Sequence, residues 1–320
     1  MLRDEMASGT RASAFYRGFA RGGVAMLLAT GRMILAAIYR LFRKRYLTRR
    51  IHRYRMILDL QDPGLSRALM LFRTREVDHK LMLERIVRPG MRIFDIGGNI
   101  GYYPLMELEL LAGSGQLIVI EPLPQNVALL KRNLQLNGYH DVPVVEAAVS
   151  NISSKKAFHL SRQSNLGTFH PTGAATLTGD TLDVETVTVP MLAERFGPPD
   201  LLRMDVEGHE VEVFEGMLED IRKDRYAPTV IFETHFRHYG EDHNMAATLK
   251  RLFELGYGVP LVSSSSDLVA NRLTQLGYVA GERIATDAVY RTLFTDIRPD
   301  DAIDFICHSG GVRTVVVARS

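Results

Sequence analysis

The chain has 320 residues, a net charge of +2 and a single cysteine, Cys307. This length allows one large α/β domain with an extension, or two small domains. A composition of 46% hydrophobic and 24% charged residues excludes a disordered or fibrous protein. A lone cysteine excludes an intrachain disulfide, so a reducing compartment is favoured over an oxidising one. We therefore expect a cytoplasmic protein.

Basic residues are concentrated at the amino-terminal end of the chain. Residues 1–55 contain thirteen Arg and Lys residues against Asp4 and Glu5, a balance of +11, which leaves 26 of the 39 basic and 35 of the 37 acidic residues for the remainder. A basic arm on an acidic body predicts an anionic partner for the arm. We favour the anionic inner face of a membrane over nucleic acid.

An apolar segment lies within this arm, between residues 22 and 42. Its apolar runs on either side of Arg32 are shorter than the ~20 residues that span a bilayer. Arg21, Arg32 and Arg43 recur every eleven residues, which is close to three helical turns, so they share one helix face. We therefore predict a basic amphipathic helical extension over residues 1–60. It lies either in the interface of a membrane or against the protein body.

The most informative stretch is residues 91–103, where apolar residues run into Asp95 and three glycines follow. A strand, a tight turn and a helix start are expected, because glycine permits positive φ and lets backbone N–H groups approach a ligand. The spacing D-x-G-x-N-x-G of Asp95, Gly97, Asn99 and Gly101 differs from the dinucleotide pattern G-x-G-x-x-G. It resembles the first motif of class I S-adenosylmethionine-dependent methyltransferases. A glycine turn with a purely structural role is the alternative.

Strands and helices alternate through the rest of the chain, which predicts one doubly wound parallel sheet over residues 61–320. Residues 65–87 are expected to form one helix, and residues 151–183 an irregular segment. Residues 263–300 break the rhythm as an insertion with a helix. Further strands are expected at residues 115–121, 142–149, 186–189, 201–206 and 228–234. β-rich runs at residues 303–308 and 314–318 predict an antiparallel carboxyl-terminal hairpin.

Glu121 ends the second expected strand, twenty residues after Gly101. In related nucleotide folds, an acidic side chain at this place accepts hydrogen bonds from ribose hydroxyls. We therefore interpret Glu121 as a cofactor ligand. A solvent-exposed glutamate at a strand end is the alternative.

The carboxyl end of the strand expected at residues 201–206 carries three candidates for catalysis: Asp205, Glu207 and His209. Asp205 and Glu207 point the same way in an extended chain, so they can act together on a hydroxyl or hold a divalent ion. His209 is a candidate general base near neutral pH. The alternatives are that Glu207 caps the helix beginning near His209, and that His209 is an exposed first-turn residue.

Other ionisable residues give weaker signals. The strand expected at residues 228–234 ends near Glu233 and His235, so either side chain can face the molecule that accepts the methyl group. His170, His238 and His243 lack the spacing of zinc ligands, so no metal site is predicted from them.

Residues 88–233 resemble the FkbM-type methyltransferases. The resemblance is carried by residues 94–103, by Glu121 and Pro122 with Asn126, Leu130 and Asn133, by residues 146–150, and above all by residues 202–210. It implies a class I methyltransferase fold with a mostly parallel seven-stranded sheet, and methyl transfer from S-adenosylmethionine. The implied acceptor is a hydroxyl of a sugar, a glycan or glycolipid, or a secondary metabolite. The implied cofactor site contains Asp95, Gly97, Gly98, Asn99, Gly101, Tyr102, Glu121, Asn126 and Ala148.

Two features depart from this family. Arg203 stands where the family usually has lysine, which keeps the charge but changes the donor geometry. The basic arm and residues 263–300 are not family features, so they leave the acceptor open as a small molecule, a glycan or a lipid-linked molecule. A nicotinamide-dependent oxidoreductase and a non-catalytic membrane adaptor remain the alternative functions.

Overall fold

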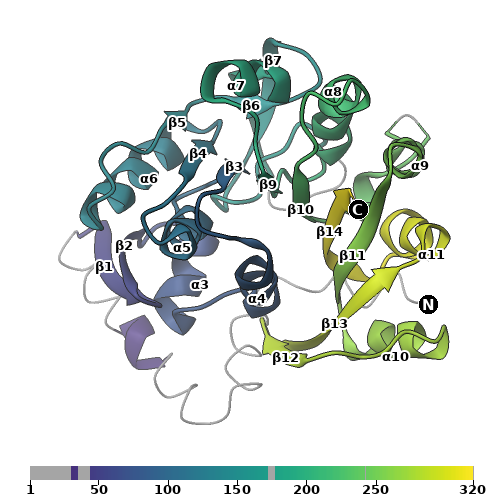
Figure 1. Ribbon diagram of the computed structural model, residues 1–320. Coiled ribbons are helices and arrows are strands. Elements are labelled where there is room, and N and C mark those ends of the chain that lie inside the picture. Colours follow the sequence, from purple (N-terminus) through teal and green to yellow (C-terminus); the bar gives the residue numbers. More distant parts are fainter. Residues whose placement is uncertain (1–29, 35–43, 172–176, 242, 320) are drawn as a thin grey trace.

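The computed structural model describes residues 30–34, 44–171, 177–241 and 243–319 (Figure 1). Within these residues, a central sheet contains nine strands in the order β12-β13-β11-β14-β10-β9-β3-β4-β5. The strands are β3 (Arg92–Ile96), β4 (Gln116–Ile120), β5 (Val144–Val145), β9 (Leu201–Met204), β10 (Thr229–Glu233), β11 (Tyr257–Ser264), β12 (Arg283–Thr286), β13 (Val289–Ile297) and β14 (Val312–Arg319). The predicted α/β fold is confirmed.

The middle of the sheet is parallel, from β5 through β4, β3 and β9 to β10. The order of the strands along the chain reverses between β3 and β9, which are neighbours in the sheet. Ligands of open α/β sheets bind beyond the carboxyl ends of the strands at such a reversal. β14 is antiparallel to β10 and β11, so an antiparallel carboxyl-terminal strand completes the sheet as predicted.

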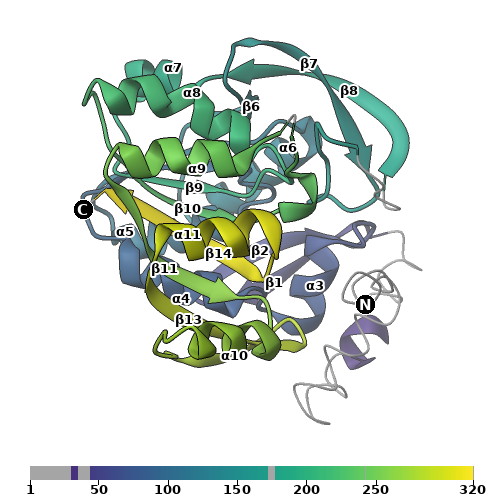
Figure 2. The same ribbon diagram turned by 90° about the vertical axis from the view of Figure 1, so that its right-hand side faces the viewer.

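Helices cover both faces of the sheet (Figure 1 and Figure 2). Along β4, Ile118 and Ile120 belong to one apolar core, whereas Leu117 and Val119 belong to the other. The first core contains residues of α7 (Val189–Phe196), α8 (Glu210–Arg222), α9 (Met245–Glu254), α10 (Asp267–Gln275) and α11 (Pro299–Ile303), and the second contains residues of α3 (Leu65–Phe72), α4 (Val77–Ile86), α5 (Tyr102–Leu111) and α6 (Pro124–Leu136). Burial on both faces explains the continuous apolar run of this strand.

Residues 46–59, at the end of the predicted helical extension, form a β-hairpin. β1 (Tyr46–Ile51) pairs with β2 (Tyr54–Asp59) in antiparallel register. Met56 and Leu58 alternate with partly or fully exposed residues and are fully buried, so a period of two, typical of a half-buried strand, overrides the helical expectation. The hairpin packs on α6 and joins the core of the sheet face that carries α3 to α6.

The apolar segment of the arm falls mostly outside the described residues. Residues 30–34 are helical, and the rest of the helix predicted between residues 22 and 42 lies outside the described part. None of the helices described has both the length and the apolar character needed to cross a bilayer.

The single helix predicted over residues 65–87 is two helices, α3 and α4. Arg73 and Glu76 have positive φ angles of 59° and 48°, which end one helix and begin the next. Tertiary contacts hold this strained backbone, because the Glu76 N–H donates to Asp287 Oδ2 at 3.0 Å and the Val77 N–H donates to Thr286 Oγ1 at 2.9 Å. The break turns Arg75 and Glu76 toward the carboxyl ends of the strands.

Residues 151–183, expected to be irregular, contain most of a second small sheet. β7 (Ser154–Ser161) pairs antiparallel with β8 (Leu177–Val187), which also pairs with β6 (Ala148–Val149). Figure 2 shows β7 and β8 as a long curved ribbon beyond the end of the central sheet. The strand predicted at residues 142–149 is thus divided between β5 in the central sheet and β6 in the small one.

One of the two strands predicted for the carboxyl-terminal hairpin is helical instead. Residues 304–308 form a π-helical turn after α11, and β14 pairs with β11 on the side away from β10. The segment 263–300 contains the predicted helix as α10 and also β12 and β13, of which β13 pairs with β11. This segment therefore widens the sheet by two antiparallel strands.

Candidate functional site

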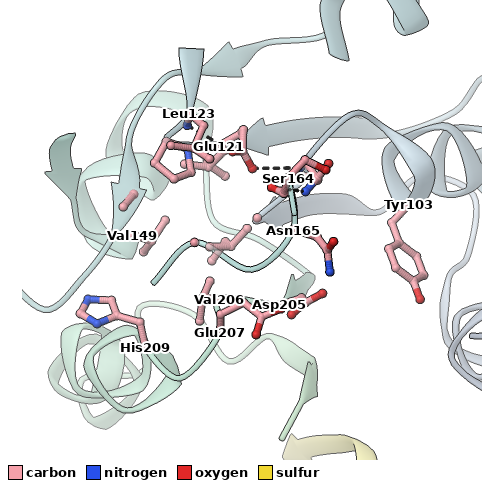
Figure 3. Close-up of a pocket in the computed structure, with 18 of the residues that line it drawn as sticks. Tyr103, Glu121, Leu123, Val149, Ser164, Asn165, Asp205, Val206, Glu207 and His209 are labelled. Atoms are coloured by element: carbon pink, nitrogen blue, oxygen red, sulfur yellow. Dashed lines mark hydrogen bonds between the residues drawn. The ribbon is translucent and has the colours of Figure 1, made fainter. Parts of the chain in front are cut away.

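A cleft of about 840 Å³ opens beyond the carboxyl ends of β3, β4 and β9. Figure 3 shows Glu121 and Ser164 on one side of this cleft, Asp205 and Glu207 across from them, and His209 at one end. This volume includes space open to solvent. The cleft therefore sits where the order of the strands reverses, as expected for a ligand site in this kind of sheet.

The turn between β3 and α5 forms the floor of the cleft. Gly97 has a φ of 83°, and a Cβ at this position would lie 2.2 Å from the backbone oxygen of Asp205. A Cβ at Gly98 would lie 2.2 Å from Val119 Cγ1. The N–H groups of both glycines donate to the carbonyl of Ile120, at 2.8 and 3.2 Å. The glycines thus permit close packing of the turn, whereas the expectation that their N–H groups face a ligand is wrong.

Glu121 is held in a fixed position just after β4. Its Oε1 accepts hydrogen bonds from Asn126 Nδ2 at 2.9 Å and from the Leu123 N–H at 3.1 Å, and its Oε2 accepts one from the Asn99 N–H at 3.0 Å. Burial raises the pKa of Glu121 to about 7, although these donors favour the charged form. A carboxylate offers about four lone-pair sites, so one acceptor site on Oε2 remains for a ligand hydroxyl.

The segment between β7 and β8 covers this side of the cleft. The carbonyl of Ser164 accepts from Asn99 Nδ2 at 3.0 Å and from Asn126 Nδ2 at 3.1 Å. Phe169 from the same segment packs edge-to-face on Phe158, with ring centroids 5.0 Å apart, and both rings line the cleft. The cover therefore combines two amide contacts with an apolar wall.

Asp205 follows β9 directly and has one carboxylate oxygen, Oδ1, that makes no hydrogen bond to the described residues and lies 3.9 Å from His235 Nε2. Its Oδ2 lies 3.4 Å from Arg203 Nη2, whereas its buried Oδ1 has no hydrogen-bond partner among the described residues. Burial and the charge of Glu233 raise the pKa of Asp205 to about 6, against the opposing charge of Arg203. Asp205 therefore offers a basic oxygen to whatever occupies the cleft.

Glu207 is a non-glycine residue in the left-handed region, with a φ of 50°. Such a conformation costs of order 1–3 kcal/mol and persists where surrounding contacts fix it. Glu207 Oε2 lies 3.3 Å from His235 Nε2, and the other ring nitrogen of His235 lies 2.8 Å from Glu210 Oε1. These carboxylates raise the pKa of His235 well above its usual value despite burial. Glu207 thus forms an ion pair at the edge of the cleft and does not cap α8.

Asp95 lies beneath the turn and outside the lining of the cleft. It is fully buried, and its Oδ1 accepts from Arg203 Nη1 at 3.1 Å. Arg203 also donates to the carbonyl of Gly97 at 3.3 Å and stacks 4.0 Å over the ring of Tyr103. One guanidinium therefore connects Asp95, the glycine turn and Asp205, which explains arginine where the family usually has lysine.

His209 lines one end of the cleft, yet both of its ring nitrogens face other protein groups. Its Nε2 lies 3.0 Å from Ser150 Oγ, and its Nδ1 lies 3.0 Å from His170 Nε2. Burial lowers the pKa of His209 to about 4, so the ring is neutral at pH 7. This geometry supports His209 as a general base less well than it supports Asp205.

Most of the residues predicted for the site meet in the cleft. The predicted residues that line it are Gly97, Gly98, Asn99, Tyr102, Glu121, Ala148, Asp205, Glu207 and His209. Asp95, Gly101 and Asn126 lie behind the lining, where Asn126 positions Glu121. Glu233 and His235 adjoin Asp205 from β10.

The sequence analysis missed several lining residues, including Arg75, Glu76 and Tyr103. Arg75 and Glu76 come from the break between α3 and α4, where one continuous helix was expected. Tyr103 Oη donates to Glu76 Oε2 at 2.7 Å. Tyr103 was detectable because it follows the glycine turn directly, whereas no local pattern marks Arg75 or Glu76.

Two groups of side chains are close enough to share a metal ion among the described residues: Asp205, Glu233 and His235, and also His170, Glu212 and His243. In each group the ligand atoms all lie within 4.8 Å of one another. The second group contains two histidines for which the sequence spacing had predicted no metal site.

A comparison with known families matches residues 95–259 to the methyltransferase FkbM domain. The matched segment is just over half of the chain and contains the glycine turn, Glu121, Asp205 and the helices that follow them.

Individual relatives are distant. The chain is 32% identical over 59 residues to a protein-L-isoaspartate O-methyltransferase of Methanothrix thermoacetophila, a match that covers 18% of this chain and 28% of that protein. The solved methyltransferase FkbM of Methylobacillus flagellatus is 14% identical, with a TM-score of 0.34, and the match covers 72% of this chain and 52% of that one. An O-methyltransferase of Bacillus cereus in complex with SAH is 10% identical, with a TM-score of 0.40, and the match covers 77% and 82%.

Proposed function

This chain belongs to the FkbM methyltransferase family, and we propose that it methylates a hydroxyl oxygen of its acceptor with S-adenosylmethionine as the donor. The observation that carries the choice of a hydroxyl is the carboxylate of Asp205, whose Oδ1 makes no hydrogen bond among the described residues, in the lining of the same cleft as Glu121. An alcohol loses its proton when it is methylated, so the acceptor side needs a base.

The cleft fits the donor in shape and chemistry. Glycine at positions 97 and 98 lets the turn pack closely against Asp205 and Val119 at the floor of the cleft, and Glu121 keeps an acceptor site for a ribose hydroxyl. Apolar residues such as Leu123, Phe158 and Phe169 supply walls for an adenine ring. When bound, S-adenosylmethionine supplies a methyl group already activated by a positively charged sulfur.

Asp205 acts as the general base in this proposal. Its carboxylate accepts the proton of the acceptor hydroxyl, while Arg203 lies 3.4 Å from Oδ2 and fixes the direction of the carboxylate. A pKa of about 6 leaves Asp205 mostly ionised at pH 7 and makes it a stronger base than an ordinary aspartate. Glu207 holds His235 and frames the acceptor, and His209 serves as part of the wall.

We propose a hydroxyl of a sugar, a glycan or glycolipid, or a secondary metabolite as the acceptor class. A lipid-linked acceptor is included because the basic arm favours an anionic membrane surface. The family match favours a methyltransferase over the oxidoreductase alternative, because a nicotinamide enzyme has no place in that family.

Isothermal titration of the purified full chain tests the donor. We expect saturable binding of S-adenosylmethionine and no binding of NAD, and the reverse result would reject the proposal. Incubating the chain and a metabolite extract with S-adenosylmethionine carrying a deuterated methyl group then identifies the acceptor by mass spectrometry. A chain that binds the donor but labels no hydroxyl would favour the adaptor alternative.

A further inference from the structure

Three histidines and a glutamate converge behind one end of the cleft, outside the groups assigned to methyl transfer. His170 comes from the segment between β7 and β8, His209 and Glu212 come from the start of α8, and His243 precedes α9. His209 and Glu212 are three residues apart, so they share one face of the helical turn. Segments distant in the sequence thus bring four potential ligands together.

The distances between their polar atoms match the edges of a metal site. A tetrahedral ion with ligands at ~2.0–2.1 Å separates neighbouring ligand atoms by about 3.3 Å. His170 Nε2 lies 3.0 Å from His209 Nδ1 and 3.6 Å from Glu212 Oε1. Glu212 Oε2 lies 3.2 Å from His209 Nδ1, and Glu212 Oε1 lies 3.3 Å from His243 Nδ1. One centre can therefore contact His170, Glu212 and His243, whose ligand atoms all lie within 4.8 Å of one another, and His209 adjoins this group through His170 and Glu212.

The outer hydrogen bonds of two histidines turn bare nitrogens toward Glu212. His243 Nε2 lies 2.7 Å from the carbonyl oxygen of Gly208, which only accepts, so Nε2 carries a proton and Nδ1 is the nitrogen left to face Glu212. His209 Nε2 faces Ser150 Oγ, which accepts from Lys156 Nζ at 3.2 Å and can donate to Asn151 Oδ1 at 3.3 Å. We assign the His209 proton to Nε2 as well, which leaves Nδ1 bare.

The carboxylate of Glu212 has no conventional cation to balance it. Its partners within ion-pair distance, among the described residues, are the three histidines, and its buried Oε2 has no hydrogen bond. Lys156, the neighbouring lysine, donates to Ser150 Oγ instead. Lone pairs of nitrogen and oxygen at these distances repel unless a positive charge, either a proton or a metal ion, lies between them.

The other candidate group, at Asp205, is already neutralised by the protein. Arg203 lies 3.4 Å from Asp205, and Arg313 forms an ion pair with Glu233. His235 is held by Glu210 at 2.8 Å. The contrast identifies the histidine group as the better metal site, although the spacing of its histidines along the sequence did not predict one.

We propose that His170, Glu212 and His243 bind one divalent transition-metal ion of the zinc class, with His209 beside them. Imidazole nitrogens favour such ions over magnesium or calcium, which prefer oxygen ligands. The hydrogen bond of His243 to the carbonyl of Gly208 is the kind of outer contact that orients a histidine ligand at such sites.

The ion has an organising role in the fold. His170 follows Phe169 directly, and Phe169 lines the cleft. By joining His170 to α8 and to the start of α9, the ion fixes the segment that covers the cofactor side of the cleft. This role does not depend on the identity of the methyl acceptor, so the site can be tested without any assay of methyl transfer.

Metal binding is measured on the full chain without a histidine tag, after treatment with a chelator. Titration with Co²⁺ should give the visible absorption of a tetrahedral complex at one ion per chain, and Zn²⁺ should displace it. His243→Ala and Glu212→Gln should each weaken binding by more than the roughly 10- to 100-fold typical of residues that only orient a ligand. Circular dichroism of the chelated variants verifies that each is folded.

His238→Ala is the matched control. Its ring lies 6.4 Å from that of His170, so it belongs to the same surroundings but not to the ligand group, and binding should be unchanged. Absence of saturable binding by the folded chain would overturn the proposal and leave protons as the bridging charges. Binding that survives His243→Ala but disappears in Asp205→Asn would place the ion at the other group, and would also overturn it.

Discussion

Asp205 and Glu207 are two residues apart, yet the backbone gives their carboxylates different surroundings. Asp205 directly follows a buried strand, and Arg203 contacts one of its oxygens and leaves the other free. Glu207 has a positive φ, and its carboxylate faces the charged ring of His235. A free oxygen with a raised pKa suits proton removal, whereas an ion-paired carboxylate suits positioning.

Replacing Asp205 by Asn should lower kcat by roughly 10²–10⁴-fold, because the amide cannot accept the proton of the acceptor. The affinity for S-adenosylmethionine should be nearly unchanged. In the natural chain, kcat/KM should rise with pH up to about 6 and level off above, because the base is inactive when protonated. Steady-state kinetics across this pH range, with calorimetry for the donor, measures both effects.

Glu207→Gln is the matched control for this assignment. It removes a carboxylate of similar position while leaving Asp205 intact, so its kcat should fall less than that of the Asp205 variant, and the rise near pH 6 should persist. A larger loss in the glutamine variant, or disappearance of the pH dependence in that variant alone, would transfer the role of base to Glu207.

Glu121→Gln should weaken donor binding by about 1.5–3 kcal/mol, or roughly 10- to 150-fold in Kd. Asn126, Leu123 and Asn99 all donate hydrogen bonds to Glu121 in the native chain. The NH₂ group of a glutamine side chain would face one of these donors in place of an acceptor oxygen, so the side chain would lose its fixed position. Titration calorimetry measures the loss. An unchanged Kd would mean that Glu121 only supports the turn and does not contact the ribose.

At the level of elements, the hairpin β1–β2 depends on one buried amide of α6. Asn133 Oδ1 accepts from the Ile57 N–H at 2.6 Å, and its Nδ2 donates to the carbonyls of Ile57 and Ile100 at 3.3 and 2.8 Å. Three backbone groups from two segments therefore share a single side chain that is fully buried.

Asn133→Leu should destabilise the fold by about 2–4 kcal/mol, because it leaves these backbone groups buried without partners. Urea unfolding followed by circular dichroism measures the change. Asn137→Ala is the comparison, since Asn137 makes analogous bonds to Arg55 in a more exposed place and should cost about 1 kcal/mol or less. Equal losses in the two variants would contradict the special role of the buried amide.

The strands that carry the cleft could be predicted because their signals are local. β3, β4 and β9 are apolar runs followed by glycine or acidic residues, so their ends and the residues Glu121 and Asp205 were placed correctly. β7 and β8 were missed because they are rich in Ser, Thr and charged residues, with little burial to produce a pattern. The strand β11 was missed because it begins directly after Gly256, which is typical of the end of a helix.

The remainder of the site depends on contacts between distant segments. Arg75 and Glu76 reach the cleft only because α3 and α4 separate at backbone angles that Asp287 and Tyr103 help to fix. The histidine group needs the small sheet to bring His170 against α8. The spacing of residues along the chain does not predict such contacts, because the packing of distant segments determines them.

At the scale of the whole molecule, the basic residues 1–55 contrast with the acidic remainder of the chain. We propose that this basic arm binds anionic lipid at a membrane surface. A deletion ending at residue 55 is unsuitable as a test, because it would remove β1, whose Ile51 is fully buried. A chain of residues 44–320 keeps the hairpin and removes most of the arm. It should bind vesicles of phosphatidylcholine and phosphatidylglycerol more weakly than the full chain does.

Salt should weaken binding of the full chain to these vesicles, because exposed charges are screened within about 10 Å at 0.1 M salt. Cosedimentation measures the bound fraction, with pure phosphatidylcholine vesicles as the comparison. Equal binding of both chains to both kinds of vesicle, at all salt concentrations, would reject the electrostatic arm.

The contact between the two turns at the centre of the cleft has a consequence for substrate change. The backbone of Gly97 touches the carbonyl of Asp205, and the Asp205 N–H donates to Ile96 at 3.1 Å, so main-chain atoms set the spacing between the two halves of the reaction. Side chains in the apolar wall of the cleft, such as Phe169, can therefore be changed while these main-chain contacts stay in place. Variants at such positions should accept different molecules and keep the same reaction geometry.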